Sequence, residues 1–154
     1  MRLTTYTDYS LRLLIYLAMP GRQTASVREV ADAFGISRYH LVKVAQQLAK
    51  EGYVETIRGR SGGVMLAQAP HDIVVGDIVR RMEEDMRIVE CFGNSTRCVI
   101  NPACRLKSIL AEAVNAFLAT LDSYTLDDLA NPDLAGLFLQ VTPVPSRKEI
   151  VHDA

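Results

Sequence analysis

Long hydrophobic runs are absent from this 154-residue sequence. The longest, Leu13–Met19, is closed by Pro20 and falls far short of the roughly 20 apolar residues that span a bilayer. Arg12 stands at its near edge, and no small-residue cleavage site follows it. We therefore expect neither a membrane span nor a secretory signal.

Cysteine is scarce as well, with three in the chain. Without an export signal we expect a cytoplasmic protein whose thiols bind metal or carry out redox chemistry instead of forming structural disulfides. We also find no Ser/His/Asp constellation, no convincing nucleophile–base pair and no nucleotide-binding fingerprint. These absences predict that the protein is not an enzyme.

The chain carries little net charge, −1 at neutral pH, but its charge is unevenly distributed. Residues 1–60 hold nine basic and five acidic side chains, a net of +4, whereas residues 61–154 hold eight basic and thirteen acidic side chains, a net of −5. The basic first part suggests a local face that binds a polyanion. Solvated surface charge is the simpler alternative.

Helix-start and helix-stop signals organise the first fifty residues. Thr7 is a candidate N-cap for a first helix that ends at Pro20-Gly21. Ser26 and Glu29 form a capping box, in which the Ser26 oxygen accepts the Glu29 amide and the Glu29 side chain reaches back to the Ser26 amide. A short second helix follows and ends at Gly35.

A third helix is predicted from about Arg38 to Lys50, with Ser37 as its N-cap and Gly52 closing it. Two helices joined by a tight glycine turn are typical of a helix-turn-helix, although a generic helical hairpin has a similar pattern. Strand-like alternation follows at Tyr53–Ile57, and residues 64–66 can pair back with it across a basic, glycine-rich tip. We therefore predict a mainly α-helical fold, a winged helix-turn-helix with a two-stranded wing.

Such a domain typically binds double-stranded DNA, with the start of its third helix in the major groove and its wing near the phosphates or the minor groove. A surface hairpin with incidental charge is the alternative for the wing. The predicted contacts are Ser37, Arg38, Tyr39, His40 and Lys43 on the helix, and Arg58 and Arg60 on the wing.

Helical signals return in the second half of the chain. A fourth helix is predicted from Asp77 to about Asp85, and a long helix from Ala103 to Ser123. The long helix carries an apolar stripe, which we interpret as a dimer interface, with packing inside one subunit as the alternative. Its members are Leu106, Leu110, Ala113, Phe117 and Leu121.

Thr125 is a candidate cap for a last short helix, and the residues after it look disordered from Thr142. We divide the chain into a DNA-binding domain at residues 1–70, a cysteine loop and dimerisation helix at 71–139, and a tail that we expect to be disordered at 140–154.

All three cysteines, Cys91, Cys98 and Cys104, fall within fourteen residues of one irregular loop. A disulfide would leave one thiol over, and zinc usually requires closer ligand pairs and a complete tetrahedron. The wider spacing suits an iron–sulfur cluster, with a fourth position left for another residue, a small molecule or nothing. An incomplete ligand set favours a sensor over a carrier. A thiol-redox or zinc-dependent winged-helix regulator, and a cluster carrier, are the competing hypotheses.

Several segments of the chain resemble the NsrR-type nitric-oxide-sensing repressors, in the winged-helix family that also contains the iron–sulfur regulator IscR. The likeness covers about residues 1–139, and Lys107 stands where the IscR branch has a ligand histidine. The matching segments are Met1–Thr4, Thr7–Tyr9, Val54–Gly59 with Gly62-Gly63, Pro102–Lys107, Ala116–Leu118 and Tyr124–Leu129.

The resemblance implies a homodimeric transcriptional repressor on a palindromic operator, released from DNA when nitric oxide destroys or nitrosylates its cluster. It favours a [4Fe-4S] cluster, with [2Fe-2S] open, on Cys91, Cys98 and Cys104. It further implies that Asp8 of the second subunit completes the ligand set. From the residues alone, Asp8 is more simply a first-turn acid that pairs with Arg12, and Glu90 or solvent could fill the fourth position.

Overall fold

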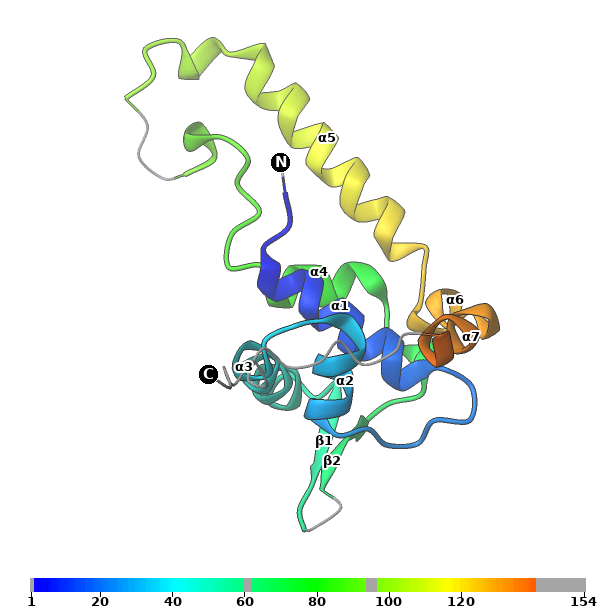
Figure 1. Cartoon of the computed structure of the whole chain (residues 1–154). Coiled ribbons are helices and arrows are strands. Elements are labelled where there is room, and N and C mark those ends of the chain that lie inside the picture. Colours follow the sequence, from blue (N-terminus) through cyan, green and yellow to red (C-terminus); the bar gives the residue numbers. More distant parts are fainter. Residues whose placement is uncertain (1, 60–61, 94–96, 141–154) are drawn as a thin grey trace, which may run out of the picture.

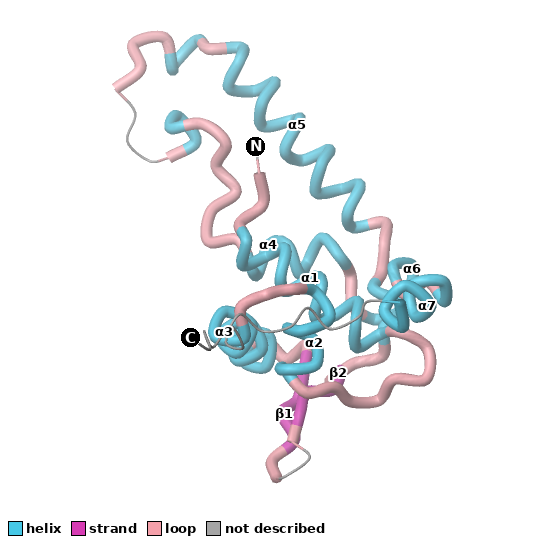
Figure 2. Tube along the Cα trace, viewed as in Figure 1, coloured by secondary structure: helices cyan, strands magenta, loops and turns pink. Residues whose placement is uncertain are grey.

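A computed structural model describes residues 2–59, 62–93 and 97–140 of the chain. It contains seven α-helices and one two-stranded antiparallel sheet among those residues, arranged as Figures 1 and 2 show. The predicted mainly α winged helix-turn-helix is confirmed. The helices are α1 (Thr5–Ala18), α2 (Val27–Phe34), α3 (Arg38–Lys50), α4 (Val75–Met82), α5 (Arg105–Asp122), α6 (Leu126–Leu129) and α7 (Pro132–Gln140).

The first helix starts one turn earlier than the sequence predicts. Thr4 is its N-cap, and the Thr4 hydroxyl accepts the backbone N–H of Thr7 at 3.2 Å. The predicted cap, Thr7, is instead fully buried inside α1. The backbone N–H of Thr4 donates to Glu83 at 2.7 Å, a partner 79 residues away that local pattern does not reveal.

The caps of α2 match the prediction in part. Ser26 accepts the Glu29 N–H at 3.0 Å, and Gly35 ends the helix with φ of +63°, a conformation that glycine adopts without strain. However, the predicted return bond from Glu29 to the Ser26 amide is wrong. The Glu29 carboxylate instead accepts the Tyr16 hydroxyl at 2.8 Å and pairs with Arg22.

The wing consists of β1 (Val54–Ile57) and β2 (Gly63–Leu66), paired antiparallel from Val54–Leu66 to Ile57–Gly63. The segment before α2 pairs with β2 through a single antiparallel β-bridge, in which Ala25 and Val64 exchange two backbone hydrogen bonds of 3.0 and 2.8 Å. The base of the wing is therefore tied to the helix-turn-helix.

A single apolar core lies around α1 and includes residues from both halves of the chain. Its large, fully buried side chains are Leu13, Leu14, Met19, Val30, Leu41, Val44, Leu48, Val54, Val64, Ile73, Ile78 and Leu126. Ile73, Ile78 and Leu126 come from the region after the wing, so α4 and α6 pack on the same core as the helix-turn-helix.

Helices later in the chain also differ from the prediction. The fourth helix spans Val75–Met82 rather than Asp77–Asp85, because Val75 already donates to the Tyr124 carbonyl at 2.9 Å and the acidic residues 83–85 lie beyond the helix end. Helix α7 (Pro132–Gln140) was not predicted from the sequence. Within the described residues, no helix is both long and apolar enough to cross a membrane. Residues 141–154, nearly all of the predicted tail, lie outside the described part of the chain.

The base of the wing yields a first prediction. A Cβ atom at Gly63 would lie 2.5 Å from the Ala25 carbonyl oxygen, a backbone atom that cannot move aside cheaply. Gly63→Ala should therefore lower the free energy of unfolding by about 1–3 kcal/mol in denaturant titrations. Gly136→Ala, at a helical position with open space around it, is the control and should not destabilise. Equal stability of the wild type and Gly63→Ala would contradict the close approach of Gly63 to Ala25 at the base of the wing.

Candidate functional site

The two faces of α3 differ sharply in burial. Leu41, Val44 and Leu48 are fully buried and join the core. The opposite face is exposed, and so are all five residues predicted as DNA contacts, Ser37, Arg38, Tyr39, His40 and Lys43, of which Ser37 is the N-cap residue just before α3. The first half of α3 therefore presents polar and aromatic groups to the surroundings, as a helix that enters a DNA groove must.

Tyr39 stands at the centre of this exposed face, with 65% of its surface accessible. The Lys43 ammonium lies 4.5 Å from the centre of the Tyr39 ring, within the range of a cation–π contact, and the His40 ring centre lies 5.8 Å from it. The Tyr6 hydroxyl donates to the Lys43 carbonyl at 2.9 Å and so ties α3 to α1. This part of α3 is thus partly ordered before any ligand arrives.

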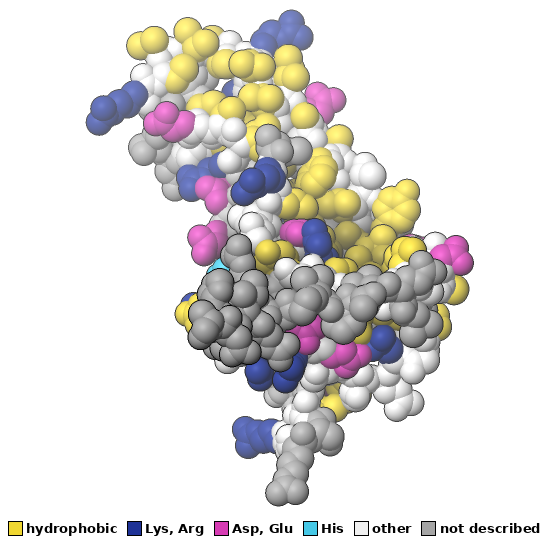
Figure 3. Space-filling view, in the orientation of Figure 1, with side chains coloured by type: hydrophobic (Ala, Val, Ile, Leu, Met, Phe, Trp, Pro, Cys, Tyr) yellow, Lys and Arg dark blue, Asp and Glu magenta, His cyan; other side chains and the backbone are white. Residues whose placement is uncertain are grey.

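The wing extends away from the helices, and basic side chains are visible at this end of the molecule in Figure 3. Arg58 follows β1 directly and is exposed. Gly59, with φ of +122°, begins the turn at the tip. Arg60, the second predicted wing contact, lies outside the described residues.

The cysteines lie on the segment that connects α4 to α5. Cys91 is half-buried in a short 3-10 turn (Glu90–Phe92), Cys98 is exposed, and Cys104 is the half-buried N-cap residue of α5. The Asn101 N–H donates to the Cys98 carbonyl at 3.1 Å, which starts the turn leading to Cys104. Among the described residues, no three His, Cys, Asp or Glu side chains come together as a metal site would require.

The donor chemistry of this loop nevertheless fits an iron–sulfur cluster. Three thiols on one loop are soft ligands of the kind that such clusters use. Asn101, between the second and third cysteine, has a buried side-chain oxygen that accepts no hydrogen bond within the described part of the chain. A buried oxygen without a donor is costly, so this turn suits a further polar partner.

Asp8 is engaged within its own helix. Its two carboxylate oxygens accept from Arg12, at 3.1 Å from Nε and 2.9 Å from Nη2. The pairing with Arg12, predicted from the four-residue spacing, is confirmed. The role of Asp8 as a ligand across a dimer stays a prediction.

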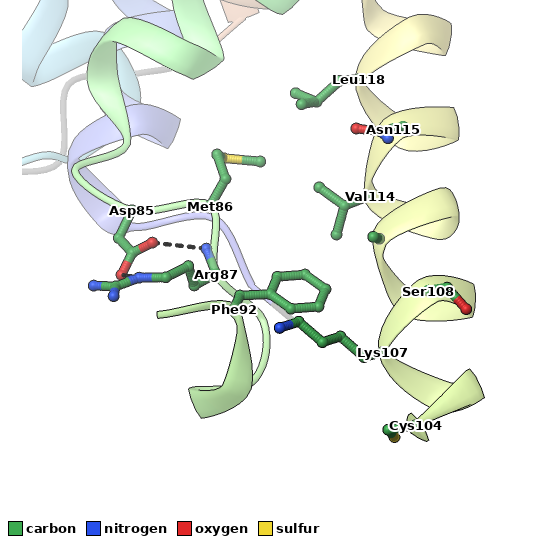
Figure 4. Close-up of a pocket in the computed structure, with 11 residues that line it drawn as sticks. Asp85, Met86, Arg87, Phe92, Cys104, Lys107, Ser108, Val114, Asn115 and Leu118 are labelled. Atoms are coloured by element: carbon green, nitrogen blue, oxygen red, sulfur yellow. Dashed lines mark hydrogen bonds and ion pairs between the residues drawn. The ribbon is translucent and has the colours of Figure 1, made fainter. Parts of the chain in front are cut away.

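A groove that was not predicted from the sequence lies between residues 85–92 and α5. Figure 4 shows Met86 and Phe92 from the loop pointing toward Val114 and Leu118 of α5, with Lys107 and Cys104 at one end. Its volume is about 740 Å³. The helical spacing of Val114 and Leu118 could have indicated an apolar face, but not what lies opposite it.

The far end of α5 is fixed to the core. The Arg80 guanidinium on α4 makes two hydrogen bonds of 2.6 Å to the Asp122 carboxylate at the end of α5. These bonds from Arg80 hold the pKa of Asp122 below its ordinary value. The Leu126 N–H also donates to the Ile73 carbonyl at 2.8 Å. The cysteine loop is therefore attached to a helix that is anchored at its other end.

An exposed basic helix, a wing and a common core define the class of protein as a winged-helix DNA-binding transcriptional regulator. The family model described as "Iron-dependent Transcriptional regulator", Rrf2, matches residues 3–132. The chain belongs to the Rrf2 family.

Individual relatives agree with this assignment. The HTH-type transcriptional regulator NsrR of Bacillus subtilis is 53% identical over 132 residues, which cover 84% of this chain and 90% of that protein. Among solved structures, oxidised CymR of Staphylococcus aureus has a TM-score of 0.70 at 26% identity and covers 85% of this chain and 97% of its own. T. potens IscR has a TM-score of 0.66 at 28% identity, with 92% and 93% covered.

The Arg80–Asp122 pair predicts a pH dependence of stability. Because the folded-state pKa of Asp122 is lowered, its contribution is complete above the ordinary carboxyl value, about 4, and is lost as the pH falls through the folded pKa. Asp122→Asn should therefore be less stable than the wild type at neutral pH, and the difference should shrink below about pH 4.

Urea titrations of the metal-free protein across this pH range measure the effect. Glu112→Gln, an exposed acid on the same helix, is the control and should follow the wild type. A difference between wild type and Asp122→Asn that stays constant with pH would show that the ion pair does not anchor α5.

Proposed function

We propose that this chain is a nitric-oxide-sensitive transcriptional repressor of nitrosative-stress genes. It acts as a homodimer, and an iron–sulfur cluster held by Cys91, Cys98 and Cys104 controls its DNA binding. The observation that carries the proposal is the position of Cys104, because this residue belongs to the cysteine loop and also begins the helix that is anchored to the DNA-binding core.

The surface of α5 supports the dimer. Of its 18 residues only Val114 is buried, while Leu106 and Ile109 are 60% and 53% exposed. Hydrophobic side chains gather over this part of the molecule in Figure 3. A helix with so little burial gains little stability from packing within one subunit. We therefore propose that a second copy of the chain packs against its exposed apolar side chains.

A symmetric dimer places two copies of α3 on one duplex. The two helices would read half-sites about one helical turn apart, or a multiple of it, in a palindromic operator. Tyr39, His40 and Lys43, with Ser37 and Arg38, are the proposed groove contacts. Arg58 and Arg60 are the proposed wing contacts, and their positive charge suits the phosphates or a narrow minor groove.

The cysteine loop is the proposed sensor. When bound, a cluster on these thiols supplies iron that nitric oxide can reach, and [4Fe-4S] is favoured over [2Fe-2S]. Asp8 of the second subunit is the proposed fourth ligand. In that role its carboxylate would give up its contacts with Arg12 and bind iron instead. While the three cysteines are bound to a cluster, the loop and the start of α5 are held in one arrangement. When the cysteines are released from it, the spacing between the two α3 helices of the dimer changes. Switching DNA binding from mostly on to mostly off requires a differential of about 5 kcal/mol between the two forms.

Substitution of a cysteine tests the sensor directly. Cys104→Ala should abolish the visible absorbance of anaerobically purified protein and de-repress the target promoter, because one of three thiol ligands is lost. Ser108→Ala, one turn further along α5, removes a hydroxyl instead of a thiol and should retain both properties. The same loss is expected for Cys91→Ala and Cys98→Ala. Normal repression by any of the three would exclude control by a cluster, and colourless wild-type protein without iron would favour a thiol-redox or zinc-dependent regulator.

The wing is tested separately from the sensor. Arg58→Ala should weaken operator binding by about tenfold at physiological salt and lower the slope of log affinity against log salt by about one, with the visible spectrum unchanged. Lys50→Ala removes one charge from the other end of α3 and serves as the control. Unchanged affinity of Arg58→Ala in fluorescence anisotropy would rule out docking through the wing.

A further inference from the structure

Helix α7 contacts the helix-turn-helix through an aromatic cluster of three rings, Tyr16, Phe34 and Phe138. Phe138 lies with its ring centre 5.3 Å from Tyr16 and 5.0 Å from Phe34, and the Tyr16 and Phe34 centres are 6.0 Å apart. All three pairs meet edge to face, the preferred arrangement of aromatic rings. One ring each comes from α1, α2 and α7, so the cluster joins three helices.

The cluster is extended by polar contacts that reach the start of α2. The Arg22 guanidinium lies 4.0 Å from the centre of the Tyr16 ring, and the Tyr16 hydroxyl donates to Glu29 at 2.8 Å. Arg22 and Glu29 also form an ion pair. Both ends of α2 are therefore held, by Glu29 near its start and by Phe34 at its last residue.

These contacts matter because α2 is a short helix, held otherwise by its packing on the core and by the Ala25–Val64 pairing before it. It has eight residues, shorter than the roughly 12 that a helix needs for stability alone, and only Val30 and Ala31 are buried. Phe34 directly precedes Gly35, the turn that sets α2 against α3. The position of the Phe34 ring is thus coupled to the angle between the two helices of the DNA-binding unit.

The segment that supplies Phe138 lies beyond the family match, which ends at residue 132, where α7 begins. We infer that α7 is a clasp that fixes α2 against α1, and that Phe138 is a positioning residue for DNA binding through Phe34. This role rests on the proposed DNA-binding function, but the clasp itself is measurable without DNA.

The experiment compares the anaerobically purified chain of residues 1–154 with its Phe138→Ala variant. Hydrogen exchange without DNA should show protection of residues 27–34 lowered about tenfold, with α4 and α5 unchanged. Affinity for an operator that the wild type selects from a random duplex library should fall about tenfold, while the visible spectrum and the dimer mass stay the same. Phe138→Tyr, which keeps the ring, should restore both properties.

Leu137→Ala is the matched control, since its side chain is 58% exposed on the same helix, and it should behave as the wild type. If Phe138→Ala cannot be purified folded, Phe138→Leu removes the ring contacts and keeps the apolar volume, and should show smaller changes in the same direction. Wild-type protection of α2 in the Phe138 variant, or a loss spread equally over all helices, would overturn the clasp. Unchanged operator affinity would overturn the role of Phe138 as a positioning residue for DNA binding. If the wild type selects no duplex, the proposed function fails, while hydrogen exchange still decides whether the clasp exists.

Discussion

The burial of α1 between two groups of helices is the constraint on which the rest of the structure depends. Leu13, Leu14 and Leu17 are almost completely inaccessible, and the surrounding core includes side chains from α2 and α3 as well as from α4 and α6. The DNA-binding face and the base of the cysteine-bearing region are thus built on one close-packed interior. Such an interior transmits displacement instead of absorbing it, which makes coupling between the two regions physically reasonable.

Helix α5, in contrast to the buried α1, is mostly exposed. It is anchored to α4 where it ends, by Arg80 and Asp122, while its beginning projects from the core with the cysteine loop attached, as Figure 1 shows. A helix of 18 residues extends about 27 Å, so a small rotation at the anchored end becomes a large displacement at Cys104. The groove beside Val114 and Leu118 and the exposed Leu106 and Ile109 are the apolar surfaces that the proposed second subunit would cover.

Local signals in the sequence predicted much of the fold, and long-range contacts explain where prediction failed. Ser26, Gly35 and the alternation in β1 act within a few residues, so the helix-turn-helix and the wing could be predicted. Thr4 as the cap of α1 depends on Glu83, and the start of α4 depends on the Tyr124 carbonyl, neither of which a local pattern contains.

For α7 a signal existed in the sequence, since Asn131 caps the helix before Pro132 and Leu134 and Phe138 are four residues apart. For the candidate site, the exposure of Tyr39 and Lys43 followed from helical periodicity, whereas periodicity does not encode how the three cysteines lie relative to one another, and the described residues do not bring them together.

The central claim is that occupancy of the cysteine loop sets the affinity for DNA, and one paired measurement tests it most directly. Operator affinity is measured on the anaerobic, iron-containing wild type, and then on the same preparation after its iron is removed by chelation, at one salt concentration. We expect affinity to fall by about three to four orders of magnitude, which corresponds to about 5 kcal/mol, while the protein stays folded. Equal affinity of the two forms would contradict it.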